Sequence, residues 1–368
     1  MKSRLLSLII ILCIPCLLFG QNKDTWVSFW NADSTLIGFK DSAGKVRIAP
    51  KFSGLTSGGK FNNIIAVTES TNSKWSSYYL TKSGKRVGKE QLYVFDNTPD
   101  CESEGFIRFR DSATHKVGMF NANGDVAIPA EYNNLTPVAN GLIIAQSGGT
   151  FDASRIDEHN QYPWTGGKEV LINRHNKLLI NDFKYDEDLN LYSLIILKKP
   201  SNDSLRESFK AVNGEYYSFI NFDREFKSWL KDSLLNNLTP GNLLKLCDDS
   251  VYNWGNSEQW EKKIKEEFID HKFSVIRPLL LNLNNPACKY QVFTDSLNPF
   301  IFDYNSKAFE KYFDDCGAAL YRKYPLKKIV ITYHINGDIQ QDHFDFLRTD
   351  EGYKLIAVSL RSNAINSN

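Results

Sequence analysis

A short phrase recurs at a fixed interval in the first half of the sequence. Residues 36–52 read LIGFKDSAGKVRIAPKF, residues 116–132 read KVGMFNANGDVAIPAEY, and a partial copy, YYLTKSGK, lies between them. The turn glycines of the three copies, Gly44, Gly84 and Gly124, follow one another every forty residues. A period of this size predicts a repeat architecture, in which each small unit completes its core by stacking on its neighbours.

Each copy has the pattern of a β-hairpin with a further strand. Alternating residues lead into a turn that ends in glycine, and alternation resumes until Pro50 in the first copy and Pro129 in the third. Because proline cannot donate a ladder hydrogen bond, we expect the strands to end at these prolines. Phe52 and Tyr132 lie eight residues after the turn glycines, and another apolar strand follows each. A degraded fourth copy has Asn176 in place of the turn glycine.

This pattern resembles the WG repeats of bacterial proteins. Gly38 and Gly118 stand in the hydrophobic-Gly-hydrophobic start of the two strong copies, whereas Tyr78 replaces that glycine in the second. The resemblance covers about residues 30–195. It implies a β-rich module of exported or envelope-associated proteins, and no particular reaction. Four small sheets of this kind can form a partial propeller or a short solenoid.

The first residues predict export. Lys2 and Arg4 precede an apolar stretch over residues 5–19, and polar sequence begins at Gln21. This is the layout of a secretory signal peptide over residues 1–20. The alternative, a membrane anchor, needs an apolar helix of about 20 residues. We therefore expect cleavage, a mature chain without a transmembrane segment, and a periplasmic, outer-envelope or secreted location.

Charge and cysteine content narrow the classes of partner. Removal of two basic residues with the signal peptide lowers the formal net charge from +1 to about −1, which argues against nucleic acid as a partner.

Four cysteines remain after removal of the signal peptide. An oxidising compartment allows three pairings among these cysteines or leaves free thiols. None forms a CxxC motif, so the sequence does not predict a zinc or thioredoxin-like site. The four are Cys101, Cys247, Cys288 and Cys316.

The character of the sequence changes near residue 198. We expect the repeat domain to occupy residues 21–197, a polar linker to follow over 198–220, and an α+β domain to span 221–368. Apolar residues at helical spacing predict a helix over 223–237. Thr239 followed by proline predicts the N-cap of a second helix.

Two more helices and a meander complete the prediction. A third helix is expected from Ser257 to Arg277, ended by Pro278, and a fourth over residues 306–323. Helices before an antiparallel meander resemble the cone-shaped α+β fold of the nuclear-transport-factor and cystatin-like group. The expected strands of the meander are residues 328–335, 339–347 and 353–360.

The polar residues of the chain do not form a recognisable reactive site. In the predicted hairpin His334 faces Ile339 and His343 faces Val330, which puts the two histidines on one face but about 13 Å apart. A register one residue longer puts them on opposite faces, and neither geometry lets them share a metal ion. The adjacent carboxylate pairs lie on predicted helices or at their ends, where neighbouring side chains point about 100° apart and cannot converge across a cleft. The acidic run 186–188 lacks the spacing of a calcium loop. We expect no catalytic residue, cofactor or metal ligand. The adjacent carboxylate pairs are Asp248-Asp249, Glu266-Glu267 and Asp314-Asp315.

Three hypotheses for function remain. The first is a non-enzymatic envelope or secreted protein that binds an unidentified protein, peptide or glycan through exposed aromatic residues: Trp26, Trp30, Tyr162 or Trp164. The last two lie in an insertion over 148–167 that stacking does not need. The second is a structural protein that dimerises through its C-terminal domain. The third is a small-molecule-binding or hydrolytic enzyme with its site in the C-terminal cone.

Overall fold

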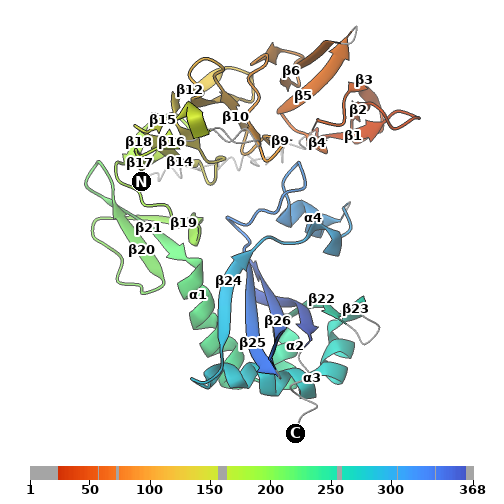
Figure 1. Cartoon of the computed structure of the whole chain (residues 1–368), viewed down its shortest axis with the longest axis vertical. Helices are drawn as coiled ribbons and strands as arrows, with labels where there is room; N and C mark the ends of the chain where they lie inside the picture. The colour runs from red at the N-terminus through yellow and green to blue at the C-terminus, as the bar shows by residue number, and fades with distance from the viewer. Residues whose placement is uncertain are drawn as a thin grey trace, which may run out of the picture.

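The computed structural model describes residues 24–56, 58–71, 74–155, 164–254, 259–304, 306–335 and 337–361. Small β-sheets follow one another in an arc from β1 to β21, and a curved sheet covered by helices lies beside this arc (Figure 1). We call residues 24–221 the repeat region and residues 222–361 the C-terminal region. No helix in the described part of the chain is both long and apolar enough to cross a membrane. The expected signal peptide lies outside the described residues.

Five turns of one kind occur among the described residues of the repeat region. In each, the first residue donates its N–H to the carbonyl of the fifth, and the fourth residue donates back to the carbonyl of the first. The fourth residue always has a positive φ, between 59 and 86°, where glycine is strongly preferred. The predicted turn positions are therefore confirmed, and a fifth is added. The fourth residues are Gly44, Gly84, Gly124, Asn176 and Gly214.

Each of the first four turns belongs to a unit of three main strands, as expected. The first two units pair edge to edge through β3 and β5, so their strands belong to one seven-stranded sheet. The main strands are β1 (Trp26–Trp30), β2 (Ile37–Lys40), β3 (Val46–Phe52), β5 (Ile64–Thr71), β6 (Lys74–Thr81), β7 (Arg86–Val87), β10 (Phe106–Arg110), β11 (Val117–Asn121), β12 (Val126–Tyr132), β14 (Leu142–Ser147), β17 (Lys168–Asn173) and β18 (Leu178–Ile180). The short strands are β4 (Lys60–Phe61), β8 (Val94–Phe95), β9 (Thr98–Pro99), β13 (Asn134–Leu135), β15 (Thr150–Phe151) and β16 (Trp164–Thr165).

The motif glycine and the motif proline lie against each other. The sequence predicts that β3 and β12 end at Pro50 and Pro129. Both strands instead continue, to Phe52 and Tyr132, through a register shift. This register shift makes β3 bulge toward β2 and β12 bulge toward β11. A Cβ atom on Gly38 would lie 2.6 Å from the carbonyl oxygen of Ile48 and 2.7 Å from the Pro50 nitrogen. Glycine is required here because the bulged backbone occupies the space of a side chain.

The segment expected to be a linker contains a β-hairpin. β20 (Arg206–Lys210) and β21 (Tyr216–Asn221) flank the fifth turn, and β21 pairs with β19 (Leu189–Leu197). The strand order in the sheet is β19-β21-β20, so the central strand is β21, the last of the three along the chain. In the first unit the central strand is β2, the second of the three along the chain. Residues 198–220 therefore continue the repeat region. Among the described strands, none of β19–β21 pairs with the first unit, so strand pairing does not close the arc.

The first two helices of the C-terminal region confirm the sequence prediction. α1 (Phe222–Trp229) is capped by Asn221 and continues as a π turn, Leu230–Leu234, and a 3-10 turn, Leu235–Asn237. α2 (Pro240–Leu246) has Thr239 at its N-cap, where the hydroxyl oxygen accepts a hydrogen bond from Asn242.

The later helices differ from the prediction. β23 (Trp260–Ile264) precedes α3 (Lys265–Leu281), and Pro278 lies inside α3 because the buried Ile276, Leu279 and Leu280 hold its last turn in the core. α4 (Lys307–Tyr312) ends where Phe313 becomes extended. Beyond it, Asp314 accepts hydrogen bonds from the N–H groups of Cys316 and Ala318, which fixes a turn in place of helix.

Six of the described strands form the sheet of the C-terminal region. Its order is β23-β22-β27-β26-β25-β24. The expected register is confirmed: His334 faces Ile339 and His343 faces Val330. The Asp248-Asp249 pair lies in a strand, β22, rather than on a helix or its end. The strands are β22 (Cys247–Trp254), β24 (Tyr290–Asp295), β25 (Leu326–Ile335), β26 (Asp338–Thr349) and β27 (Gly352–Leu360).

Candidate functional site

A cavity of about 410 Å³ lies where the repeat region meets the segment after α4. Its walls come from segments that are far apart in the sequence: 93–103, the connection 137–139, β19, and residues 314–323. We call it the interregion cleft. The side chains that shape its chemistry are Tyr93, Phe95, Asp100, Glu102, Arg108, Tyr192, Asp314, Tyr321, Arg322 and Lys323.

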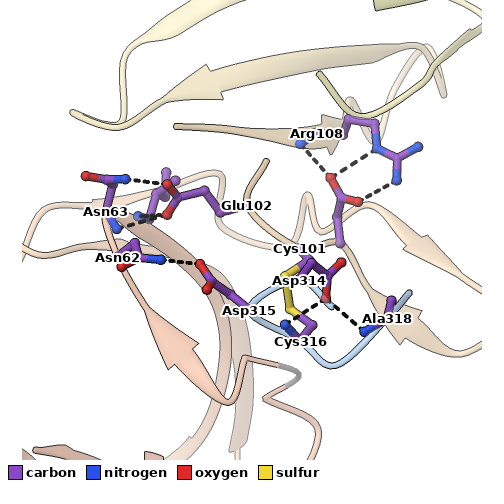
Figure 2. Close-up of a disulfide and its surroundings, with 11 residues drawn as sticks. Asn62, Asn63, Cys101, Glu102, Arg108, Asp314, Asp315, Cys316 and Ala318 are labelled. Carbon is purple, nitrogen blue, oxygen red and sulfur yellow. Dashed lines mark hydrogen bonds and ion pairs between the residues drawn. A yellow bond between two sulfur atoms is a disulfide. The ribbon is translucent and has the colours of Figure 1, made fainter. Parts of the chain in front are cut away.

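A disulfide joins the two walls of the interregion cleft (Figure 2). It links Cys101 to Cys316, which are 215 residues apart in the sequence and have Cα atoms 6.1 Å apart. Of the pairings left open by the sequence, this is the one observed. Cys247 and Cys288 carry free thiols. Burial raises the pKa of the Cys247 thiol to about 12 and also raises the pKa of Cys288, so neither is a reactive thiolate near neutral pH.

Hydrogen bonds next to the disulfide fix both walls (Figure 2). Oδ1 of Asp314 accepts from the N–H groups of Cys316 and Ala318, each at 2.9 Å. Burial raises the pKa of Asp314. Across the disulfide, Glu102 accepts from the N–H groups of Asn63 and Ile64. These carboxylates therefore hold backbone in place.

One described group has the spacing of metal ligands: Cys101, Asp314 and Cys316. Its two sulfur atoms are bonded to each other. Since a thiolate is what binds a metal ion, the oxidised chain offers only a carboxylate here.

A neutralised arginine forms another part of the cleft wall. Arg108 donates from its backbone N–H and its Nε to Oδ2 of Asp100, at 2.8 and 3.0 Å. The Asp100 side chain is only 5% exposed and that of Arg108 14%. The guanidinium lies 4.1 Å from the ring centre of Tyr93. The charge of Arg108 is therefore balanced within the wall, and the aromatic stack holds the arginine rigid.

The opposite wall carries two adjacent cations. The Arg322 guanidinium lies 5.2 Å from the ring centre of Tyr185, and the Lys323 nitrogen lies 5.3 Å from that of Tyr192. Burial, with the nearby Glu104 carboxylate, raises the pKa of Tyr192 to about 12, so its hydroxyl stays protonated. Tyr192 donates this proton to Glu104 at 3.4 Å. This wall presents positive charge next to aromatic rings.

The aromatic residues expected to bind a partner lie elsewhere. Trp26 packs edge-on to Phe61 at 5.4 Å, and Trp30 is half exposed on the same strand. Trp164 packs against Phe151 at 5.2 Å, and its Nε1 has no hydrogen-bond acceptor among the described residues. Tyr162 lies outside the described residues. The strands that carry these tryptophans, β1 and β16, lie at separate places along the arc (Figure 1), so they do not form one site.

The residues of the interregion cleft were not found by sequence reasoning. They become neighbours only through contacts between the two regions. The cysteine pair was the one available signal, because Cys101 lies in the repeat region and Cys316 in the C-terminal region. Pairing across the regions was one of the connectivities that the sequence left open.

Comparison with known proteins supports the repeat assignment. Residues 118–151 match the family model described as WG containing repeat. The match covers β11 to β15, and hence one of the two strong copies. No curated protein matches the sequence of this chain. The solved structure named "Rd1NTF2_04 with long sheet" is 12% identical over 38% of this chain and 94% of its own length, with a TM-score of 0.18. A TM-score this low carries no argument about the C-terminal fold.

Proposed function

We propose that this chain is an exported, non-enzymatic binding protein of the bacterial envelope, with two domains and a ligand site in the interregion cleft. The observation that supports this proposal best is the cleft itself. Its volume of about 410 Å³ lies within the range of small-ligand sites, roughly 300–1,000 Å³. Both regions contribute walls, and the disulfide between Cys101 and Cys316 ties those walls together.

The acidic groups of the cleft favour binding over acid–base catalysis. Asp100 is occupied by Arg108, Glu102 by the backbone at residues 63–64, and Asp314 by the turn that follows it. A general acid or base needs a free position from which to reach the substrate. These three carboxylates instead hold the walls in a fixed shape, which lowers the cost of ordering the site when a ligand binds.

Two observations support export. The N-terminal sequence has the layout of a signal peptide. In addition, the chain forms a disulfide between distant segments, and such bonds persist in oxidising compartments.

The proposal is tested by blocking the cleft. Ala318 is exposed and lines the cleft, so Ala318→Trp fills the space without entering a core. Ala43→Trp makes the same change on an exposed turn of the first unit. We expect a panel of defined oligosaccharides and short peptides to contain a ligand that the mature wild-type chain and Ala43→Trp bind equally, and that Ala318→Trp binds at least ten times more weakly. Full binding by Ala318→Trp, or no binding of any panel member by wild type, would contradict the proposal.

A second candidate, assembly of two copies, is favoured by one edge of the C-terminal sheet. β24 is an edge strand, and Tyr290 and Phe293 on it are 39% and 42% exposed. Phe300, just after it, is 92% exposed. An exposed edge with apolar side chains can pair with a second copy. Light scattering should then give a dimer mass that Phe300→Asp lowers to that of a monomer. A monomer mass for wild type at all concentrations would exclude this role.

A further inference from the structure

Two cations in the interregion cleft, Arg322 and Lys323, form no close ion pair among the described residues. None of the ion pairs formed by the described residues includes Arg322 or Lys323, although both line the cleft. Arg322 lies over the rings of Tyr185 and Tyr321, and Lys323 lies over those of Tyr192 and Tyr324. The Asp350 carboxylate, which Lys323 also influences, is paired with Lys311. In a partly buried site, a positive charge without a counter-ion attracts anions more strongly than it would in water.

The other charged side chains that line the cleft are bound to groups of the cleft wall itself. Asp100 pairs with Arg108 at 3.0 Å. The carboxylates of Glu102 and Asp314 accept hydrogen bonds from backbone N–H groups on their own walls. The lining as a whole is close to neutral, with its positive charge gathered at Arg322 and Lys323, and a ligand meets two adjacent cations there. An arginine beside a lysine suits a carboxylate, since the guanidinium can form two parallel hydrogen bonds with it.

The remaining lining residues favour a ring-shaped ligand over an extended peptide. A peptide that adds to a sheet edge needs a row of free backbone donors and acceptors. Pro99 and Pro137 lie in the wall, and neither has an N–H to donate. The cleft instead offers aromatic side chains, with Phe95 64% exposed and Tyr192 36% exposed. The C–H faces of a sugar ring pack well on aromatic rings, and tyrosine can also hydrogen-bond to sugar hydroxyls.

We infer, on the basis of the binding function proposed above, that the interregion cleft binds an acidic saccharide. Its sugar ring packs against Tyr192 and the neighbouring aromatic side chains of the cleft. Its carboxylate pairs with Arg322 and Lys323. The rigid stack of Arg108 and Tyr93 forms the facing wall.

The test uses the mature chain with its disulfide intact and three probes of similar length. These are an oligogalacturonate trimer, the neutral trisaccharide maltotriose, and a glutamate tripeptide. Calorimetric titration should show the galacturonate trimer binding at least ten times more tightly than either other probe. Its affinity should fall as salt rises, because the contact is between charges. Equal affinity for the acidic and neutral sugars, or tighter binding of the peptide, would overturn the inference.

Matched variants locate the contact. Arg322→Gln and Lys323→Gln should each weaken binding of the galacturonate trimer at least tenfold. Lys307→Gln removes the same charge from an exposed site on α4, away from the lining of the cleft, and should leave affinity unchanged. Unchanged affinity in Arg322→Gln and Lys323→Gln would overturn the inference.

The two proposals can fail separately. If Ala318→Trp abolishes binding of maltotriose or the peptide while Arg322→Gln has no effect, the cleft is the site but its ligand is not an acidic saccharide. If the galacturonate trimer binds Ala318→Trp as well as it binds wild type, the cleft itself is excluded.

Discussion

The ammonium nitrogen of Lys327 lies 2.6 Å from Oδ1 of Asp188, although the residues are 139 positions apart in the sequence. The Lys327 side chain is only 2% exposed and that of Asp188 24%. Thr294 completes the network, accepting from Lys327 at 2.8 Å and donating to Asp188 at 2.9 Å. A buried ion pair therefore joins the repeat region to the sheet of the C-terminal region, at a place distinct from the disulfide.

Removal of one partner of this pair should destabilise the chain strongly. Asp188→Ala leaves the Lys327 ammonium buried without a counter-ion, which costs about 3 kcal/mol of unfolding free energy. The double variant Asp188→Ala with Lys327→Met removes both charges and should recover most of the loss. Urea unfolding of the three proteins measures this. A loss below about 0.5 kcal/mol in Asp188→Ala would show that the pair does not contribute to stability.

The cysteines should divide into one bonded pair and two thiols. Alkylation of the denatured, unreduced chain should label Cys247 and Cys288, and a digest should contain a peptide that links Cys101 to Cys316. Replacement of both bonded cysteines by serine should lower the unfolding free energy by about 2–4 kcal/mol, because the bond closes a long loop in the unfolded chain. A digest with any other pairing would contradict the observed connection between the regions.

Asp345 should make stability depend on pH. Burial raises its pKa to about 6, and Lys328, whose nitrogen lies 3.9 Å away, opposes this shift only in part. Between about pH 4 and 6 the folded chain therefore keeps a proton that the unfolded chain has lost. Unfolding free energy should fall as pH rises through this window.

A variant isolates this contribution. Asp345→Asn should be more stable than wild type at pH 7.5, by up to about 3 kcal/mol, and equal to it near pH 3. Asp338→Asn, an exposed change on the same strand, should track wild type at every pH. His343, whose pKa is lowered by burial, is present in all three proteins and does not affect the comparison. A constant difference between Asp345→Asn and wild type over pH 3–8 would refute the assignment.

The fifth turn should behave like the turns of the first two units. Gly44, Gly84 and Gly214 all have positive φ, and a Cβ there would meet no atom within 4 Å. Alanine at each position should therefore cost about 1–2 kcal/mol through backbone conformation alone. Gly241→Ala, in helix α2, should stabilise the chain by about 0.5–1 kcal/mol. If thermal or urea unfolding shows that Gly214→Ala leaves the unfolding free energy unchanged, the turn at Gly214 is not equivalent to those at Gly44 and Gly84.

Features set by local geometry could be read from the sequence. The turns at Gly44, Gly84 and Gly124, the Thr239 cap and the register of the His334 hairpin depend on a few neighbouring residues, and the sequence predicts all of them. The turn at Gly214 was not predicted because the sequence around it lacks the proline of the two strong copies. The order of the strands β19, β20 and β21 in their sheet also differs from that of the first unit.

Features set by contacts between distant segments could not be predicted. Pro278 was expected to end a helix, but burial of the residues around it in the core outweighs the lost hydrogen bond. β22 runs parallel to β27, more than ninety residues later in the chain, and nothing near Asp248 indicates this pairing. The interregion cleft is the extreme case, since no segment contains more than part of its wall.

A crystal structure of the mature chain with the tightest-binding saccharide of the panel tests whether the interregion cleft is the ligand site. We predict ligand density between Tyr192 and Arg108, with a charged group of the ligand against Arg322 and Lys323. Density at the Trp164 hairpin, at Trp30 or on the C-terminal sheet, with the cleft empty, would contradict the claim.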